Sequence, residues 1–159
     1  MKRTSEAPCV LETPIGAVAV TFQDGCLTSL SFCDDVCRSG QKTAHSKPAP
    51  AELVRHELEL YFLGKLRKFS VPLRLSGPVF YKRVWDALMG IPFGETRTYR
   101  QVAAEVGSPQ AFRAVGNACA ANPIAIIVPC HRVVAAHGLG GYGGGLRRKE
   151  WLLRHELSM

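Results

Sequence analysis

The sequence has little that would place it in a membrane or in a fibrous or repetitive class of protein. No apolar run approaches the roughly 20 residues that a membrane-spanning helix needs, and residues 1–6 lead into no signal-type apolar core. It has no internal repeat and no low-complexity segment. Hydrophobic residues make up 47% of the chain, and charged residues make up 21%, as in an ordinary globular protein. We therefore expect a globular protein of the cytoplasm with no membrane partner.

Acidic residues are scarce relative to basic ones. The 159 residues include 13 Asp and Glu against 20 Lys and Arg, which gives a formal net charge of +7. Residues 77–159 hold 10 basic and 5 acidic side chains, a net +5, whereas residues 1–76 hold 10 and 8, a net +2. Phosphates attract such an excess, although a positive charge also serves solubility. The second half is therefore the half in which we expect any contact with nucleic acid.

The six cysteines do not suggest a disulfide framework, because no secretion signal is present and the chain has enough apolar residues to form a core. We expect reduced thiols. Cys130 differs from the others because His131 follows it directly.

Alternating apolar and polar residues with turn residues between them fill the first third of the chain. The pattern predicts strands over 10–13, 17–22 and 27–32, a surface loop over 34–50, a helix over 51–63 and a strand over 69–75. One face of that helix would hold Leu53, Val54, Leu58, Tyr61 and Phe62. The predicted fold class is α+β, with a small N-terminal antiparallel-sheet domain (1–74) and a mainly helical C-terminal domain (75–159).

The second half predicts a series of short helices. Ser76 is positioned to cap a helix that runs from Val79 to Met89. Thr98 and Gln101 have the spacing of a capping box, so a second helix should begin at Tyr99 and end before the glycine at 107. A third helix would run over 110–121, with Ser108 as its cap and a proline in its first turn.

The last two of these helices would form a helix-turn-helix. Small side chains keep the second of them slim, and Arg113 is its only charged residue. The pattern fits DNA binding, and it also fits an ordinary helical hairpin.

The apolar run over 124–128 predicts a short buried strand that leads into the sequence Pro129-Cys130-His131-Arg132-Val133. A neighbouring imidazole that accepts the thiol proton would increase the share of nucleophilic thiolate. Adjacent side chains of a strand face opposite ways, so a bend or a bridging water would be needed between Cys130 and His131. The glycine-rich residues 138–145 add backbone amides close by in sequence. We predict that Cys130 is a nucleophile.

Several motifs occur in a fixed order along residues 79–156. They are Gly94-Glu95-Thr96, Tyr99-Arg100-Gln101, Arg113-Ala114-Val115-Gly116, Asn122-Pro123, Pro129-Cys130-His131-Arg132-Val133, Gly141-Tyr142-Gly143-Gly144-Gly145-Leu146 and Lys149-Glu150-Trp151-Leu152-Leu153. In these motifs the chain resembles the O6-alkylguanine-DNA alkyltransferases, also called methylated-DNA-protein-cysteine methyltransferases. The first 70 residues match mainly in length and strand-like character.

The resemblance implies DNA repair by direct damage reversal. An alkyl (methyl) group would move from O6-alkylguanine in duplex DNA to Cys130, irreversibly and once per molecule, and O4-alkylthymine is left open as a second substrate. His131 would act as base through a water, and Glu156 would orient His131. Tyr99 would donate a hydrogen bond to the base ring, and Asn122 would hold the turn around the cysteine.

The resemblance also implies the contacts with the substrate and with DNA. The flipped guanine would meet the backbones of Cys130 and Val133, the backbone amide of Gly143 and the side chain of Tyr142. A helix in the minor groove of double-stranded DNA would contribute Arg113, which fills the gap left by the flipped base, together with Ala111, Ala114, Gly116, Asn117 and Tyr99. The protein would act as a monomer.

No metal and no other cofactor is expected. Some members of the family bind zinc in the first domain, but the potential ligands here do not match the spacing of that site; they are Cys9, Cys26, Cys33, Cys37 and His45.

Gly143 and Ala125 stand where some members have a hydroxyl residue and a second proline. The range of alkyl groups accepted is therefore left open.

Two rival functions are open to the same residues. A regulator or lesion sensor would bind DNA without chemistry, but such sensors lack the reactive cysteine. A Cys-His hydrolase would turn over, because water releases an acyl group from a thiol, whereas a thioether is not hydrolysed.

Overall fold

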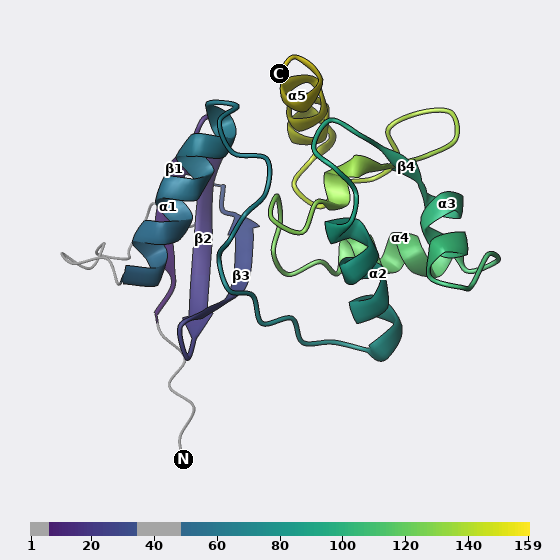
Figure 1. Cartoon of the computed structure of the whole chain (residues 1–159), viewed down its shortest axis with the longest axis horizontal. Helices are drawn as coiled ribbons and strands as arrows, with labels where there is room; N and C mark the ends of the chain where they lie inside the picture. Colours follow the sequence, from purple (N-terminus) through teal and green to yellow (C-terminus); the bar gives the residue numbers. More distant parts are fainter. Residues whose placement is uncertain (1–6, 35–48) are drawn as a thin grey trace. The chain divides into compact units, whose positions relative to one another are not determined.

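The computed structural model of the chain describes residues 7–34 and 49–159 (Figure 1). The chain divides into two compact units, residues 1–75 and residues 76–159. In its described part the first unit holds a three-stranded sheet and a helix, and the second unit is mainly helical. The predicted α+β fold class is confirmed. The predicted loop over 34–50 falls mostly on residues 35–48, which lie outside the described residues.

Strands β1 (Cys9–Thr13), β2 (Gly16–Gln23) and β3 (Cys26–Phe32) form an antiparallel meander in the order β1-β2-β3. They match the three predicted strands to within one residue at each end. Asp24 and Gly25 connect β2 to β3, with φ angles of 52° and 77°. Two successive positive φ angles are typical of the type I′ turn, whose twist suits antiparallel strands.

Helix α1 (Ala49–Phe62) packs against β1. Its side chains Val54, Leu58 and Tyr61 are buried, as the pattern predicted. Leu53 was predicted on the same face but is 39% exposed. Glu57 is buried on that face instead, because its carboxylate accepts hydrogen bonds from backbone N–H groups and a hydroxyl group of the segment that follows α1.

The predicted strand over 69–75 is wrong. Only Leu73 pairs, as a single parallel bridge to Leu27 of β3. The Leu27 N–H donates to the carbonyl of Pro72 at 2.8 Å, and the Arg74 N–H donates to the carbonyl of Leu27 at 2.9 Å. Proline has no N–H to donate, so the ladder does not extend past this point.

In the second unit, helix α2 (Val79–Met89) packs against the hairpin of α3 (Tyr99–Glu105) and α4 (Phe112–Ala120). Trp85 is 2% exposed, and its indole N–H donates to the carbonyl of Ala118 at 2.9 Å. Strands β4 (Arg97–Thr98) and β5 (Val133–Val134) pair in parallel, and α5 (Leu146–Leu157) follows. The parallel pair sets the start of α3 beside the residues that follow Cys130.

The predicted capping box of α3 is confirmed. The Gln101 N–H donates to Oγ1 of Thr98 at 3.1 Å, and the Thr98 N–H donates to Oε1 of Gln101 at 2.8 Å. Gly107 ends the hairpin's first helix with a φ of 80°, a conformation that glycine adopts without a steric penalty.

The predicted caps of two helices are wrong, and one of these helices also begins later than predicted. Helix α4 begins at Phe112 rather than at 110, because Ser108 accepts a backbone hydrogen bond from Ala111 at 2.9 Å in a separate turn. Helix α2 has Pro78 at its N-cap rather than Ser76.

Within the described parts of the chain, no helix has the length and apolar character to cross a membrane.

Candidate active site

The segment that leads into Cys130 is a tight turn, and the predicted strand over 124–128 is wrong. Ile126 has a φ of 70°, and the Val128 N–H donates to the carbonyl of Ile124 at 3.0 Å. A positive φ in a β-branched residue breaks an extended run. These three side chains are at most 1% exposed, so the apolar pattern reports burial rather than a strand.

Asn122 holds this turn together through its side-chain amide. Its Nδ2 donates to the carbonyl of Val128 at 2.8 Å and to Sγ of Cys130 at 3.1 Å, and its Oδ1 accepts from the Ile124 N–H at 3.0 Å. An amide side chain has both donors and acceptors, which is what this set of contacts requires. One residue therefore fixes both the backbone of the turn and the position of the thiol.

Cys130 opens a single 3₁₀ turn, Cys130–Arg132, and is 8% exposed. Burial raises the pKa of its thiol, while the hydrogen bond from Asn122 and the positive charge of Lys149 lower it in part. Successive side chains in a 3₁₀ turn are about 120° apart. The opposed arrangement of Cys130 and His131 that a strand would impose is therefore absent.

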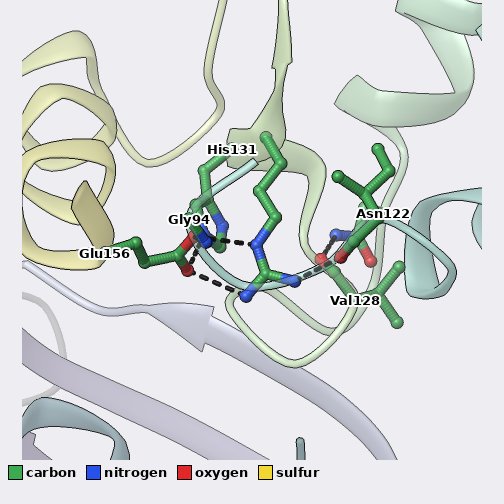
Figure 2. Close-up of polar contacts among 7 residues, drawn as sticks. Gly94, Asn122, Val128, His131 and Glu156 are labelled. Atoms are coloured by element: carbon green, nitrogen blue, oxygen red, sulfur yellow. Dashed lines mark hydrogen bonds and ion pairs between the residues drawn. The ribbon is translucent and has the colours of Figure 1, made fainter. Parts of the chain in front are cut away.

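His131 and Glu156 form a buried pair, shown in Figure 2. Nε2 of His131 lies 2.8 Å from Oε1 of Glu156, and neither residue is more than 3% exposed. A carboxylate only accepts, so Nε2 carries the hydrogen of a neutral ring and Nδ1 carries the lone pair. Burial lowers the pKa of His131 against the opposing effect of Glu156. Among the described residues, Nδ1 has no hydrogen-bond partner, which leaves it as a base atom.

Glu156 is also held by groups other than His131. Nε and Nη2 of Arg132 donate to its two oxygens at 2.9 Å each, and the Gly94 N–H donates to Oε2 at 3.2 Å. Burial by itself would raise the pKa of Glu156, but the hydrogen bonds from His131 and Arg132 hold it well below its usual range. Glu156 therefore stays ionised.

Cys130 lines a pocket of about 220 Å³ between α4 and the glycine-rich segment after β5. The residues around it are Tyr99, Gly116, Cys119, Ala120, Cys130, Gly141, Tyr142 and Gly143. Glycines expose backbone amides, and the two tyrosines offer flat aromatic faces. Burial and the nearby Cys130 raise the pKa of Cys119 to about 12.

Tyr99 packs directly on the glycine-rich segment. A Cβ added to Gly140, whose φ is +72°, would lie 2.7 Å from the Tyr99 hydroxyl oxygen. Burial raises the pKa of Tyr99, while a hydrogen bond with the backbone of Gly141 lowers it in part. Burial likewise raises the pKa of Tyr142. Both hydroxyl groups are therefore protonated at neutral pH and can donate.

Lys149 ties α5 to the wall of the pocket. It is fully buried, and its Nζ donates to the carbonyl of Val133 at 2.6 Å and to that of Gly141 at 3.0 Å. Sequence reasoning missed Lys149, along with Arg132 and Cys119. A signal was available for Lys149, because it shares the apolar face of α5 with Leu152.

The remaining predicted residues lie partly outside the pocket. Arg113 and Asn117 are exposed on α4, Ala114 is half-buried on the same helix, and Ala111 is half-buried at its N-cap. Val133 is buried and does not line the pocket. Of the predicted DNA-contact residues on α4, Gly116 is the one that lines it.

Among the described residues, no group of three or more His, Cys, Asp or Glu side chains is arranged to hold a metal. Cys37 and His45, two of the potential ligands in the sequence, lie outside the described residues.

Known protein families match both units of the chain. The model described as 6-O-methylguanine DNA methyltransferase, DNA binding domain, matches residues 79–158, which is half of the chain. The model for the ribonuclease-like domain of the same enzyme matches residues 9–75. The chain belongs to the 6-O-methylguanine DNA methyltransferase family.

Individual members of the 6-O-methylguanine DNA methyltransferase family match along most of the chain. The methylated-DNA–protein-cysteine methyltransferase of Mycobacterium leprae is 47% identical over 148 residues, which cover 92% of this chain and 89% of the relative. The protein of that name from Mycolicibacterium paratuberculosis is 44% identical over 147 residues, with the same coverage.

Solved structures of the 6-O-methylguanine DNA methyltransferase family have the same fold. The crystal structure of Mycobacterium tuberculosis OGT in complex with DNA superposes with a TM-score of 0.83 at 43% identity, covering 95% of this chain and 93% of that one. The O6-methylguanine-DNA methyltransferase of Pyrococcus kodakaraensis superposes with a TM-score of 0.68 at 26% identity, covering 94% and 97%.

Proposed function

We propose that this chain repairs DNA by direct reversal of damage, transferring an alkyl group, typically methyl, from O6 of guanine in double-stranded DNA to Cys130. The observation that carries the proposal is the Cys130 thiol in the wall of a pocket, next in sequence to a buried His131 that is paired with Glu156. A thiol with an imidazole base close by is suited to nucleophilic attack. The thioether product is not hydrolysed, so each molecule acts once.

The step exchanges one bond for another. The bond between the alkyl carbon and O6 of guanine breaks, and a bond between that carbon and Sγ of Cys130 forms. The thiol proton passes through a water to Nδ1 of His131, and Glu156 stabilises the imidazolium that results. The electron pair of the broken bond stays on guanine, and this anion becomes neutral by taking one proton from water. The His131 imidazolium returns its proton to water, so the net change moves the thiol proton to guanine.

The pocket walls assist the leaving guanine. Tyr99 donates a hydrogen bond to the base ring, and the backbone N–H of Gly143 donates toward O6. Hydrogen bonds that strengthen as charge develops on the base lower the barrier to its departure. Tyr142 packs on the base, and the backbones of Cys130 and Val133 read its edge.

Double-stranded DNA would bind along α4 through its minor groove, with the damaged guanine flipped into the pocket. Flipping costs a few kcal/mol, and the side chain of Arg113 fills the gap in the stack. The small or short residues Ala111, Ala114, Gly116 and Asn117 allow α4 to approach the groove closely. The minor groove carries a degenerate code, so repair would be tolerant of sequence.

The two halves of the chain would divide these tasks. Residues 75–159 form the DNA-binding and alkyltransferase domain, and residues 1–74 form the N-terminal α+β domain. The protein would act as a monomer in the cytoplasm, without a metal or other cofactor.

Intact-mass spectrometry tests this function. The purified protein and its Cys130→Ala variant are each mixed with duplex DNA that contains one O6-methylguanine. We expect the wild-type protein to gain one methylene, about 14 Da by elemental arithmetic, in a single covalent step. Peptide mapping should place the gain on Cys130, and the variant should gain nothing. Normal DNA binding with no gain in mass would leave a lesion sensor and contradict the enzyme; release of product with repeated turnover would indicate a hydrolase.

A further inference from the structure

The guanidinium of Arg132 is built into the buried pair of His131 and Glu156. Arg132 is 6% exposed. Its Nε and Nη2 donate to Oε2 and Oε1 of Glu156 at 2.9 Å each, and its Nη1 donates to the carbonyl of Ile91 at 2.7 Å. Its guanidinium carbon also lies 5.8 Å from the centre of the Phe93 ring. The planar fork of arginine matches both oxygens of the carboxylate at once, which an ammonium group does not do.

The hydrogen bonds among Arg132, Glu156 and His131 determine which of these three side chains carry a charge. Glu156 accepts from His131 through Oε1 and from Arg132 through both oxygens. With Arg132 charged, Glu156 ionised and His131 neutral, the three side chains sum to zero charge. Without Arg132 the same neutral histidine would leave an uncompensated buried carboxylate, which is costly unless His131 takes up a proton.

We propose that Arg132 is a positioning residue for alkyl transfer: by holding Glu156 at both oxygens and neutralising it, Arg132 keeps His131 a neutral base with Nδ1 unprotonated. The inference rests on the proposed function, because it concerns the base that receives the thiol proton. Arg132 supplies the positive charge that neutralises the carboxylate, which neither Glu156 nor a neutral His131 can supply.

The charged groups that face His131 come from two elements. Glu156 and Lys149 belong to α5, and Arg132 belongs to the same turn as His131. Burial lowers the pKa of His131, Glu156 raises it, and Arg132 and Lys149 lower it further. Helix α2, which also packs against this turn, buries only Val84, Trp85 and Leu88. Removal of Arg132 therefore takes away one of the two positive charges that lower the pKa of His131. The carboxylate of Glu156, which raises that pKa, is then left without an ion-pair partner.

The test is the pH dependence of single-turnover methyl transfer from an O6-methylguanine duplex. Wild type is compared with Arg132→Gln, Arg132→Lys and the control Arg154→Gln, which breaks an exposed arginine pair with Glu150 on α5. In Arg132→Gln the acid limb of the profile should move to higher pH, with about a tenfold loss of rate on that limb for each pH unit of displacement. Arg132→Lys keeps the charge, so its acid limb should return toward that of wild type. Arg154→Gln should match wild type.

A purely structural role would give a different result. If Arg132→Gln had a lower plateau rate or a lower melting temperature but an acid limb that coincides with wild type, the proposal would be overturned. If that variant does not fold, ¹⁵N NMR of histidine-labelled wild-type protein decides: His131 should be neutral with hydrogen on Nε2 at about pH 7. A charged ring there would contradict the proposal. This NMR result is independent of methyl gain on Cys130, which tests the proposed function separately.

Discussion

Nδ2 of Asn122 lies 3.1 Å from Sγ of Cys130 and 2.8 Å from the carbonyl oxygen of Val128, so a single amide group orients the thiol and closes the turn that carries it. Burial works against the ionised thiol, and the hydrogen bond from Asn122 favours it. The reactivity of Cys130 should therefore depend on a side chain eight positions earlier in the sequence.

Replacement of Asn122 should slow the chemistry of the thiol. Asn122→Ala removes a hydrogen bond to a group that becomes charged, worth about 1.5–3 kcal/mol, or roughly a 10- to 150-fold loss of rate. Asn122→Asp should be slower still, because it places a negative charge beside the thiolate. The measurement is the rate at which iodoacetamide modifies Cys130 as a function of pH. Gln110→Ala, at an exposed position before α4, is the control and should react like wild type; equal rates in all variants would contradict the role of Asn122.

The contact between Gly140 and Tyr99 predicts a sharp difference between two glycines. In Gly140→Ala a Cβ would lie 2.7 Å from the hydroxyl oxygen of Tyr99, at a φ of +72°. We expect a loss of about 1–2 kcal/mol from the backbone conformation alone, and a displaced Tyr99 in addition. Methyl transfer should slow and the melting temperature should fall. Gly138→Ala, where nothing lies within 4 Å, should change neither; similar behaviour of the two variants would refute the packing argument.

Arg113 should matter for DNA and not for the chemistry. It is exposed on α4, so Arg113→Ala should fold normally. Loss of the side chain that fills the stack should reduce methyl transfer from duplex DNA about tenfold or more, because flipping the base costs a few kcal/mol. Transfer from the free base O6-methylguanine needs no flipping and should be unaffected. The control is Arg154→Ala at the far end of α5; a slower reaction of Arg113→Ala with the free base would argue against this role.

Stability should fall with acidification in two stages. In the unfolded chain, a histidine takes up a proton at about pH 6.5. In the folded protein, burial lowers the pKa of His131, so this residue takes up its proton only at lower pH. The unfolded state therefore binds more protons as the pH falls below about 6.5, and stability is lost. Glu156 has a folded pKa below its usual range, so its contribution is present above about pH 4.3 and declines as the pH falls further.

Urea denaturation at a series of pH values measures this effect. The midpoint should begin to fall below about pH 6.5 and should fall more steeply below about pH 4.3. His131→Gln removes the first titration, so its midpoint should stay flatter between these values. A midpoint that rises on acidification, or a wild-type curve identical to that of the variant, would contradict the assigned burial of a neutral His131.

The sequence by itself determined the features that depend on neighbouring residues. The three strands of the first unit, their turn at Asp24 and Gly25 and the capping box of Thr98 and Gln101 all follow from side chains that act within a few positions. The motif around Cys130, together with the ordered motifs before and after it, also identified the family. Apolar periodicity reported burial correctly even where it gave the wrong backbone, as in residues 124–128.

Tertiary structure decided what depends on partners far apart in the chain. The turn before Cys130 depends on an amide at Asn122, and the ladder near Leu73 ends at a proline. Glu156 is 25 positions from His131, so only the packing of α5 brings its carboxylate within 2.8 Å of the ring. Arg132 and Lys149 look like surface residues in the sequence, since charged side chains are rarely buried without partners. Their partners are a distant carboxylate and distant carbonyls, and the fold alone brings these groups together.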